Sequence, residues 1–323
     1  MRSLAAAALC LSSLTVVAAA SDRPQMVLVS FDGANDVALW QRSQALAEKS
    51  GARFTYFLSC VYLLGPESKT LYRGPQRSAG RSNVGFATSK ADATARLTEI
   101  WKAHNRGHEI ASHGCGHFDG KDWSRSDWEI EFKAFSRILN DAWTINGHDT
   151  PAGWRYMANE AMRGFRAPYL STGKALDAAL VDAGYEYDAS AVSRGPAEPV
   201  LEGGLVRFSL PLIPEGPRQR PIIAMDYNLY VRHSAAIERP SESGVFEERA
   251  YAAFRQAFDA EYAGDRRPLE IGLHFRLMND GAYWRATERL VTEVCGLEDV
   301  RCITYRDYAS RVSAEKTSDT DGD

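Results

Sequence analysis

The segment that most constrains the fold is residues 25–31, a nearly continuous apolar run between Pro24 and Asp32. A strand that is apolar at almost every position has both faces buried, which is typical of a parallel sheet covered by helices. Residues 36–49 follow with apolar side chains close to the helical period, and residues 53–58 form a second strand. Strand, helix and strand in this order predict a parallel sheet with crossover helices.

The alternation of strand and helix continues along most of the chain. Further strands are expected at residues 108–112, 164–169, 185–189, 205–213, 222–225, 269–274 and 300–304. We find about seven strand–helix alternations, no internal repeat and no linker to a second module. A single α/β domain over residues 21–313, a distorted (β/α) barrel of about seven parallel strands, explains this pattern better than an open doubly wound sheet.

The two ends of the chain differ from this pattern. Residues 1–20 have the features of a secretory signal peptide, with Arg2, an apolar segment and a small-residue end before Ser21. We therefore expect a periplasmic or secreted protein, and we find no second apolar run long enough to span a bilayer. Residues 314–323 are polar and acidic, which predicts a disordered tail.

The net charge and the cysteine count limit which binding partners and which cellular compartment are expected. The formal net charge is −4 and no dense Lys/Arg run occurs, so neither nucleic acid nor an anionic membrane is an expected partner, and we expect a monomer. Four cysteines follow the predicted signal peptide, and an even number in an exported protein indicates disulfides. Of three possible pairings we favour Cys295–Cys302, which closes a short loop and leaves Cys60 with Cys115.

Two histidines, His113 and His117, lie four residues apart in a glycine-rich segment that follows a predicted strand. One helical turn or a tight loop would direct both imidazoles at one point. Neutral imidazoles bind zinc, and a catalytic zinc has about three protein ligands and an open position. Cys115 lies between the histidines, but a disulfide is the stronger interpretation of that residue.

Other polar residues also follow predicted strands: Asp32, the segment Arg166–Tyr169, and His274. In βα barrels the chemistry lies at the carboxyl ends of the strands, so one shared site is expected. Each residue also has a structural interpretation. Asp32 and Asp36 could cap the following helix, and His274 could be a hydrogen-bonded core histidine.

Four motifs together carry a family resemblance: Ser30-Phe-Asp-Gly33, His113-Gly-Cys-Gly-His117, Arg166-Ala-Pro-Tyr169 and Leu273-His274. Their order and intervals resemble those of the polysaccharide deacetylase family, also called the NodB-homology domain or carbohydrate esterase family four. The flanking residues look most like the chitin deacetylase branch. The resemblance covers roughly residues 24–310 and implies a distorted barrel, a divalent metal, and hydrolysis of N-acetyl groups on glycans.

The resemblance also implies roles for individual residues. His113 and His117 would hold Zn²⁺ or another divalent cation, which polarises the acetyl carbonyl. Asp32 would be the general base. The backbone N–H of Tyr169 would help to stabilise the oxyanion.

Three further residues would support this chemistry. His274 would protonate the departing amine. Arg166 would pair with Asp32 and keep it ionised, because an adjacent cation lowers the pKa of a carboxyl group. Asp226, which follows a predicted strand, is the expected partner of His274.

The chain departs from the family pattern at Gly33, where a second aspartate usually supplies a metal ligand. Asp32 could bind the metal itself, which we favour, and Asp36 is the second choice. Asp119 could also approach the metal, or two histidines and water could hold it more weakly. The other possibility is a homologue that binds glycan and hydrolyses it slowly or not at all.

The polymer is expected to be chitin or chitooligosaccharide, with peptidoglycan, an exopolysaccharide or acetylated xylan as alternatives. The loops at residues 61–90 and 194–221 would distinguish these substrates. Indole rings stack on sugars, but aromatic residues are more often part of the core. The candidates for one or two sugar contacts are Trp123, Trp128, Trp154 and Trp284.

Overall fold

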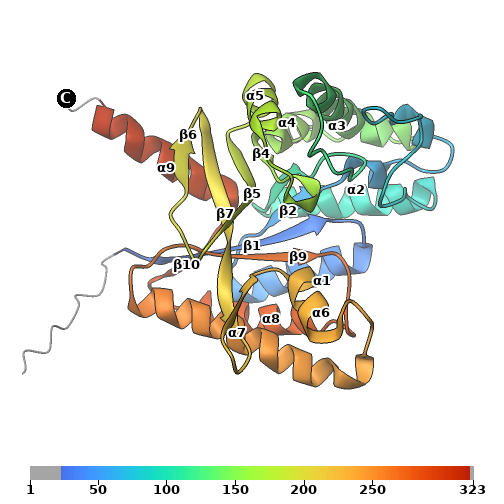
Figure 1. Ribbon diagram of the computed structural model, residues 1–323. Coiled ribbons are helices and arrows are strands. Elements are labelled where there is room, and N and C mark those ends of the chain that lie inside the picture. The colour runs from blue at the N-terminus through green and yellow to red at the C-terminus, as the bar shows by residue number, and fades with distance from the viewer. Residues whose placement is uncertain (1–22, 321–323) are drawn as a thin grey trace, which may run out of the picture.

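The computed structural model describes residues 23–320, with side chains up to residue 315. Figure 1 shows a central sheet with α2, α3, α4 and α5 on one side and α1, α6, α7 and α8 on the other. The predicted signal peptide at residues 1–20 lies outside the described residues, as do residues 321–323. Coverage by helices on both sides is the arrangement that the buried first strand predicts.

Seven parallel strands form the barrel wall, as predicted. They are β1 (Gln25–Gly33), β2 (Thr55–Leu58), β3 (Glu109–Ser112), β4 (Gly164–Phe165), β5 (Tyr187–Ser193), β7 (Leu205–Glu215) and β9 (Leu269–His274). Their order is β9-β1-β2-β3-β4-β5-β7. Ala224 closes the ring, because it donates to Pro211 O on β7 and accepts from Gly272 N on β9, both at 2.9 Å.

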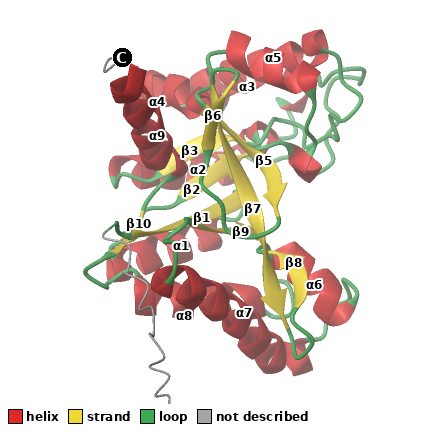
Figure 2. Cartoon of the chain, turned by 60° about the vertical axis from the view of Figure 1, so that its left-hand side comes forward, coloured by secondary structure: helices red, strands yellow, loops and turns green. Residues whose placement is uncertain are grey.

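Three short strands extend this wall. β10 (Val300–Cys302) runs parallel to the start of β1, and β6 (Val200–Glu202) and β8 (Arg220–Ile223) run antiparallel to β7. Figure 2 shows the long β7 with β6 near one end and β8 near the other. The sequence did not predict β6, and the strand expected at residues 222–225, which corresponds to β8, was counted among the parallel strands. The connection before β8 is too short for a crossover, so only a hairpin is possible there.

Helices connect most of the strands. They are α1 (Val37–Ser50), α2 (Lys90–Asn105), α3 (Arg125–Ile145), α4 (Trp154–Glu160), α5 (Lys174–Asp182), α6 (Asp226–Ser234), α7 (Ser243–Ala263), α8 (Ala282–Val294) and α9 (Tyr305–Thr320). The last helix differs from the predicted tail at residues 314–323, because α9 continues to Thr320. Charged residues dominate that segment, and its composition gave no apolar period from which to predict a helix.

The candidate sugar-binding tryptophans belong mainly to the core. Trp128, Trp154 and Trp284 are at most 2% exposed. Trp284 packs against Phe31 of β1, with ring centroids 5.0 Å apart. Trp123 is partly buried and packs on the same core. The interpretation of these aromatic residues as core is therefore confirmed for the first three.

Both expected disulfides are present, Cys295–Cys302 and Cys60–Cys115. The second joins the short helix η1 (Cys60–Leu63), which follows β2, to the histidine loop that follows β3. None of the helices within residues 23–320 is both long and apolar enough to cross a lipid bilayer.

Candidate active site

The site is built around a buried ion pair between Asp32, near the end of β1, and Arg166, just after β4. The Arg166 Nη1 lies 2.9 Å from Asp32 Oδ1, and the two side chains are 0% and 3% exposed, respectively. The Arg166 backbone N–H donates to Ser112 O of β3 at 3.0 Å, which fixes the position of the arginine beside the histidine loop. The predicted pairing of these two residues is present.

Arg166 is held inside the barrel by further hydrogen bonds. It donates to Ser30 Oγ at 2.7 Å, to Tyr305 Oη at 2.9 Å and to Ala189 O at 3.0 Å. Its guanidinium carbon also lies 4.2 Å from the centroid of the Phe57 ring. A guanidinium bonded on all sides cannot rotate away from Asp32, so the direction of the carboxylate is fixed as well.

Two opposing effects set the protonation of Asp32. Burial, the largest single effect, raises the pKa of this carboxyl group, but the Arg166 guanidinium together with His113 and His274 outweighs it. The pKa of Asp32 is therefore lowered from its ordinary value of 3.8. At neutral pH the carboxylate is ionised and can accept a proton.

His274 lies opposite Asp32 on the neighbouring strand β9, where the two residues are register partners. Its Nδ1 is 2.7 Å from Asp226 Oδ1, and its backbone N–H donates to Asp226 Oδ2 at 2.7 Å. Burial lowers the pKa of His274, but the Asp226 carboxylate together with Asp32 outweighs burial, and the pKa is raised from 6.5. The imidazole is 33% exposed, so it can reach a bound molecule.

The two histidines of the loop lie together, with ring centroids 5.0 Å apart. His113 Nδ1 lies 2.8 Å from Arg166 O; a carbonyl only accepts, so Nδ1 donates and Nε2 keeps a free lone pair. Burial lowers the pKa of His113 to about 3, and burial together with repulsion from His274 lowers that of His117. Both rings are therefore neutral at pH 7, the form that binds metals.

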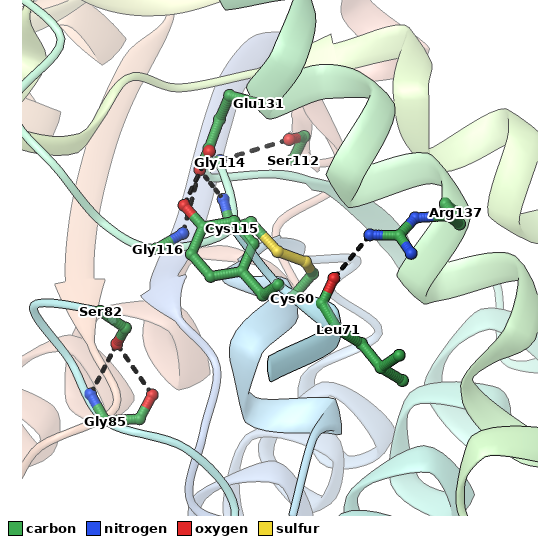
Figure 3. The surroundings of a disulfide bond; sticks show 11 residues. Cys60, Leu71, Ser82, Gly85, Ser112, Gly114, Cys115, Gly116, Glu131 and Arg137 are labelled. Atoms are coloured by element: carbon green, nitrogen blue, oxygen red, sulfur yellow. Dashed lines mark hydrogen bonds between the residues drawn. A yellow bond between two sulfur atoms is a disulfide. The ribbon is translucent and has the colours of Figure 1, made fainter. Parts of the chain in front are cut away.

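A buried carboxylate from α3 supports this loop. Glu131 accepts from the backbone N–H groups of Cys115 and Gly116 at 2.6 and 3.0 Å, and from the Tyr72 hydroxyl at 2.7 Å. Figure 3 shows Glu131 directed at these two amides beside the Cys60–Cys115 disulfide. Gly116 permits the close approach, because a Cβ there would collide with the Tyr72 hydroxyl. The histidine loop is thus fixed both covalently and by hydrogen bonds.

Three non-glycine residues with left-handed backbone lie at the same place. His117, Tyr169 and Leu170 have φ values of 53°, 59° and 54°, in the left-handed region that favours glycine. The Tyr169 ring is 60% exposed, and its centroid lies 5.1 Å from that of His117. Strain of this kind persists where surrounding contacts over-determine the backbone, and it is common at functional sites.

The predicted metal site is incomplete in its third ligand. Within residues 23–320, no group of three or more His, Cys, Asp or Glu side chains is arranged to hold a metal ion. Asp36 instead caps α1, accepting from Leu39 N at 2.9 Å, and Asp119 accepts from Lys121 N and the Ser171 hydroxyl. The site therefore lacks the three-ligand set that we expected with Asp32 or Asp36.

The two imidazoles themselves fit a divalent metal. His117 Nδ1 is buried and has no hydrogen-bond partner among the described residues, and His113 Nε2 is left free by the bond at Nδ1. An orphaned buried nitrogen costs free energy unless a ligand or water satisfies it. The donor set is thus two neutral nitrogens, with the Asp32 carboxylate engaged by Arg166.

Comparison with known proteins identifies the fold of the chain through similar structures, but finds no match in sequence. No protein-family model matches the chain, and no curated protein matches it in sequence. A protein assigned as a polysaccharide deacetylase from Mycobacterium smegmatis is similar in structure, with a TM-score of 0.57 and 17% identity over 95% of this chain and 96% of that chain. Another, from Pseudomonas aeruginosa PAO1, gives 0.55 and 15% over 90% and 91%. The chain therefore has the polysaccharide deacetylase fold.

Several supporting residues were missed by the sequence analysis. Glu131 had a detectable signal, because it lies on the apolar face of α3 between Trp128 and Phe135. A carboxylate at such a position requires buried partners. Tyr305 and Glu270, which form a 3.0 Å hydrogen bond behind Arg166, had no such signal.

We predict that Glu131→Ala lowers the free energy of unfolding by about 2–4 kcal/mol, because two amide N–H groups and one hydroxyl lose their acceptor. Chemical denaturation measures the loss, and hydrogen exchange at residues 114–117 should accelerate. Glu129→Ala, on an exposed face of the same helix, is the control and should cost about 0.5 kcal/mol or less. Equal losses of unfolding free energy in Glu131→Ala and Glu129→Ala would contradict the role of Glu131 in holding the histidine loop.

Proposed function

We propose that this protein is a hydrolase that removes N-acetyl groups from the amino sugars of a glycan. The observation that carries the proposal is the pairing of an ionised carboxylate, Asp32, with a histidine of raised pKa, His274, on adjacent strands. Amide hydrolysis needs a base to activate water and an acid to protonate the leaving amine. Between the lowered pKa of Asp32 and the raised pKa of His274, the two groups are in the opposite protonation states that this chemistry requires.

In this proposal each residue has one task. Asp32 takes the proton of the attacking water, and Arg166 holds the carboxylate in place. His274, oriented by Asp226, donates its proton to the departing amine. The backbone N–H of Tyr169 donates to the developing oxyanion.

His113 and His117 would hold a divalent metal such as Zn²⁺. Bound there, the metal would supply Lewis-acid polarisation of the acetyl carbonyl. The buried, neutral imidazoles support this assignment. The contribution of the chain itself is to fix both rings through Glu131 and the Cys60–Cys115 disulfide.

A second candidate is a glycan-binding protein with little or no hydrolytic activity. It is favoured by the absence of a three-ligand group in residues 23–320 and by Gly33, which has no donor atom. The two candidates differ in whether acetate is released. The prediction of chitin as the polymer remains a prediction, because likeness at this level of identity concerns the fold alone.

The test is acetate release from chitooligosaccharides, peptidoglycan and acetylated xylan, with and without a chelator. We expect release from an N-acetylated substrate, inhibition by the chelator, and loss of both bound metal and activity in His113→Ala. Unchanged acetate release by His113→Ala would refute the site. Binding to glycan without acetate release from any of these substrates would favour the second candidate.

The pH dependence of kcat/KM should reflect the lowered pKa of Asp32 and the raised pKa of His274. Asp32 must be deprotonated and His274 protonated, so kcat/KM should be high between a limb below pH 3.8 and a limb above pH 6.5. In Asp226→Asn the attraction that raises the His274 pKa is removed and burial lowers it. The alkaline limb should then move below pH 6.5, while the acidic limb stays in place; an unmoved alkaline limb would exclude His274 as the acid.

Gly33→Asp should tighten zinc binding by about tenfold or more, because it adds a charged ligand beside two neutral imidazoles. A Cβ at Gly33 would meet only Tyr62, at 3.9 Å, but the φ of +87° strains any side chain there. The strain should cost about 1 kcal/mol of stability. Gly33→Asn carries the same strain with a weaker ligand, so calorimetric zinc affinities that are equal in the two variants would contradict the missing-ligand account.

A further inference from the structure

The loop that follows β2 and η1 is strongly basic in an acidic protein. Residues 65–90 contain five basic residues, Lys69, Arg73, Arg77, Arg81 and Lys90, and one acidic residue, Glu67, which gives 5 − 1 = +4 where the whole chain is −4. Lys90 pairs with Glu67 at 3.7 Å. The other four cations are exposed, and none of them forms an ion pair within the described part of the chain.

This loop packs directly on the candidate active site. Asn83 donates from its backbone to Gly116 O at 2.9 Å and from its side chain to the Tyr169 hydroxyl at 3.5 Å. The Arg77 guanidinium lies 5.2 Å from the centroid of the Phe118 ring, and Phe118 follows His117 in sequence. Asn83 and Arg77 therefore place this basic loop against the histidine loop.

A fifth cation lies on the opposite side of the site. Arg276 comes two residues after His274 and donates from its backbone to His274 O at 2.8 Å. Its side chain is exposed and forms no ion pair among the described residues. We name these five residues the cationic rim: Lys69, Arg73, Arg77, Arg81 and Arg276.

The local charge of the loop differs from that of the chain as a whole. Arginines of α7 and α8 have carboxylate partners, as in Arg255–Asp259 at 2.8 Å and Arg285–Glu247 at 2.6 Å. Unpaired cations on one loop repel one another and raise the local concentration of anions. In a protein with excess carboxylates, a loop of net charge +4 that packs on the site indicates an anionic ligand there.

We propose that the cationic rim binds an anionic glycan, one in which uronate carboxylates accompany the acetylated amino sugars. A guanidinium donates two parallel hydrogen bonds to a carboxylate, which suits recognition of uronic acids. Exposed Tyr169 offers an aromatic face for a sugar ring beside these charges. The net charge of −4 disfavours nucleic acid and anionic lipid surfaces as ligands. The assignment of an acetylated sugar depends on the proposed function, but binding through the rim does not.

The experiment compares binding of two oligosaccharides by calorimetry at low ionic strength. One alternates N-acetylglucosamine with glucuronate, and the other is neutral chitohexaose. We expect the uronate oligosaccharide to bind about tenfold more tightly. The difference should vanish at about 1 M salt, where the screening length is about 3 Å.

A double variant and a control variant test whether the preference for the uronate oligosaccharide depends on the cationic rim. Arg77→Gln/Arg81→Gln should lose most of the preference for the uronate oligosaccharide and keep its affinity for chitohexaose and its Tm. Arg301→Gln is the control, because Arg301 is an exposed arginine in β10, at the opposite end of the barrel, and forms no ion pair among the described residues. It should bind both oligosaccharides as the wild-type protein does.

Equal affinity for the two oligosaccharides, or a preference unchanged in the double variant, would overturn the proposal. So would tighter binding to sulfated chondroitin alone, to duplex DNA or to vesicles of anionic phospholipid. Failure of the proposed function would be distinct: the uronate oligosaccharide would bind in a rim-dependent way, and no acetate would be released.

Discussion

The buried ion pair of Asp32 and Arg166 is the interaction on which the site depends. Burying two charges carries a large desolvation penalty, which is recovered only with close geometry and satisfied hydrogen bonds. Arg166 meets this requirement through bonds to β1, β5 and the start of α9, at Ser30, Ala189 and Tyr305. Segments far apart in the sequence must therefore all be in place before the pair is stable, which couples completion of the barrel to formation of the active site.

Much of this arrangement could be predicted from local patterns. The apolar run of β1 fixes a strand buried on both faces, and polar residues at its carboxyl end must then point into the mouth of a barrel. The pairing of Asp32 with Arg166 and of His274 with Asp226 was expected from the motifs and is present. The cysteine pairing was expected from loop length alone.

The other features of the fold and the site depend on contacts between residues far apart in the sequence, which local sequence patterns do not predict. Glu131 on α3 accepts hydrogen bonds from the histidine loop, which lies before that helix in the sequence. Tyr305 contacts Arg166 from the last helix of the chain. The antiparallel β6 and β8 pair with the first and last residues of β7, Leu205–Arg207 and Leu212–Glu215. The missing third ligand was visible as Gly33, but Asp36 had two possible roles, metal ligand or helix cap, and only the structure shows that it caps α1.

The site and its surroundings combine fixed geometry with unusual charge. Neutral imidazoles, an ionised carboxylate and an oriented histidine lie beside a loop of net charge +4 in a chain of net charge −4. This basic loop, residues 65–90, packs on the histidine loop, and in the proposed function it would bring an anionic glycan to Asp32 and His274.

The most direct test of this account is the pKa of Asp32, measured by the carbon-13 shift of its carboxyl group and assigned with Asp32→Asn. The account predicts a value below the ordinary 3.8, because Arg166 together with His113 and His274 outweighs burial, and a rise in Arg166→Met. A value at or above 3.8 in the wild-type protein would mean that burial dominates. Asp32 would then be poorly suited as the base, and the organising role of the ion pair would be refuted.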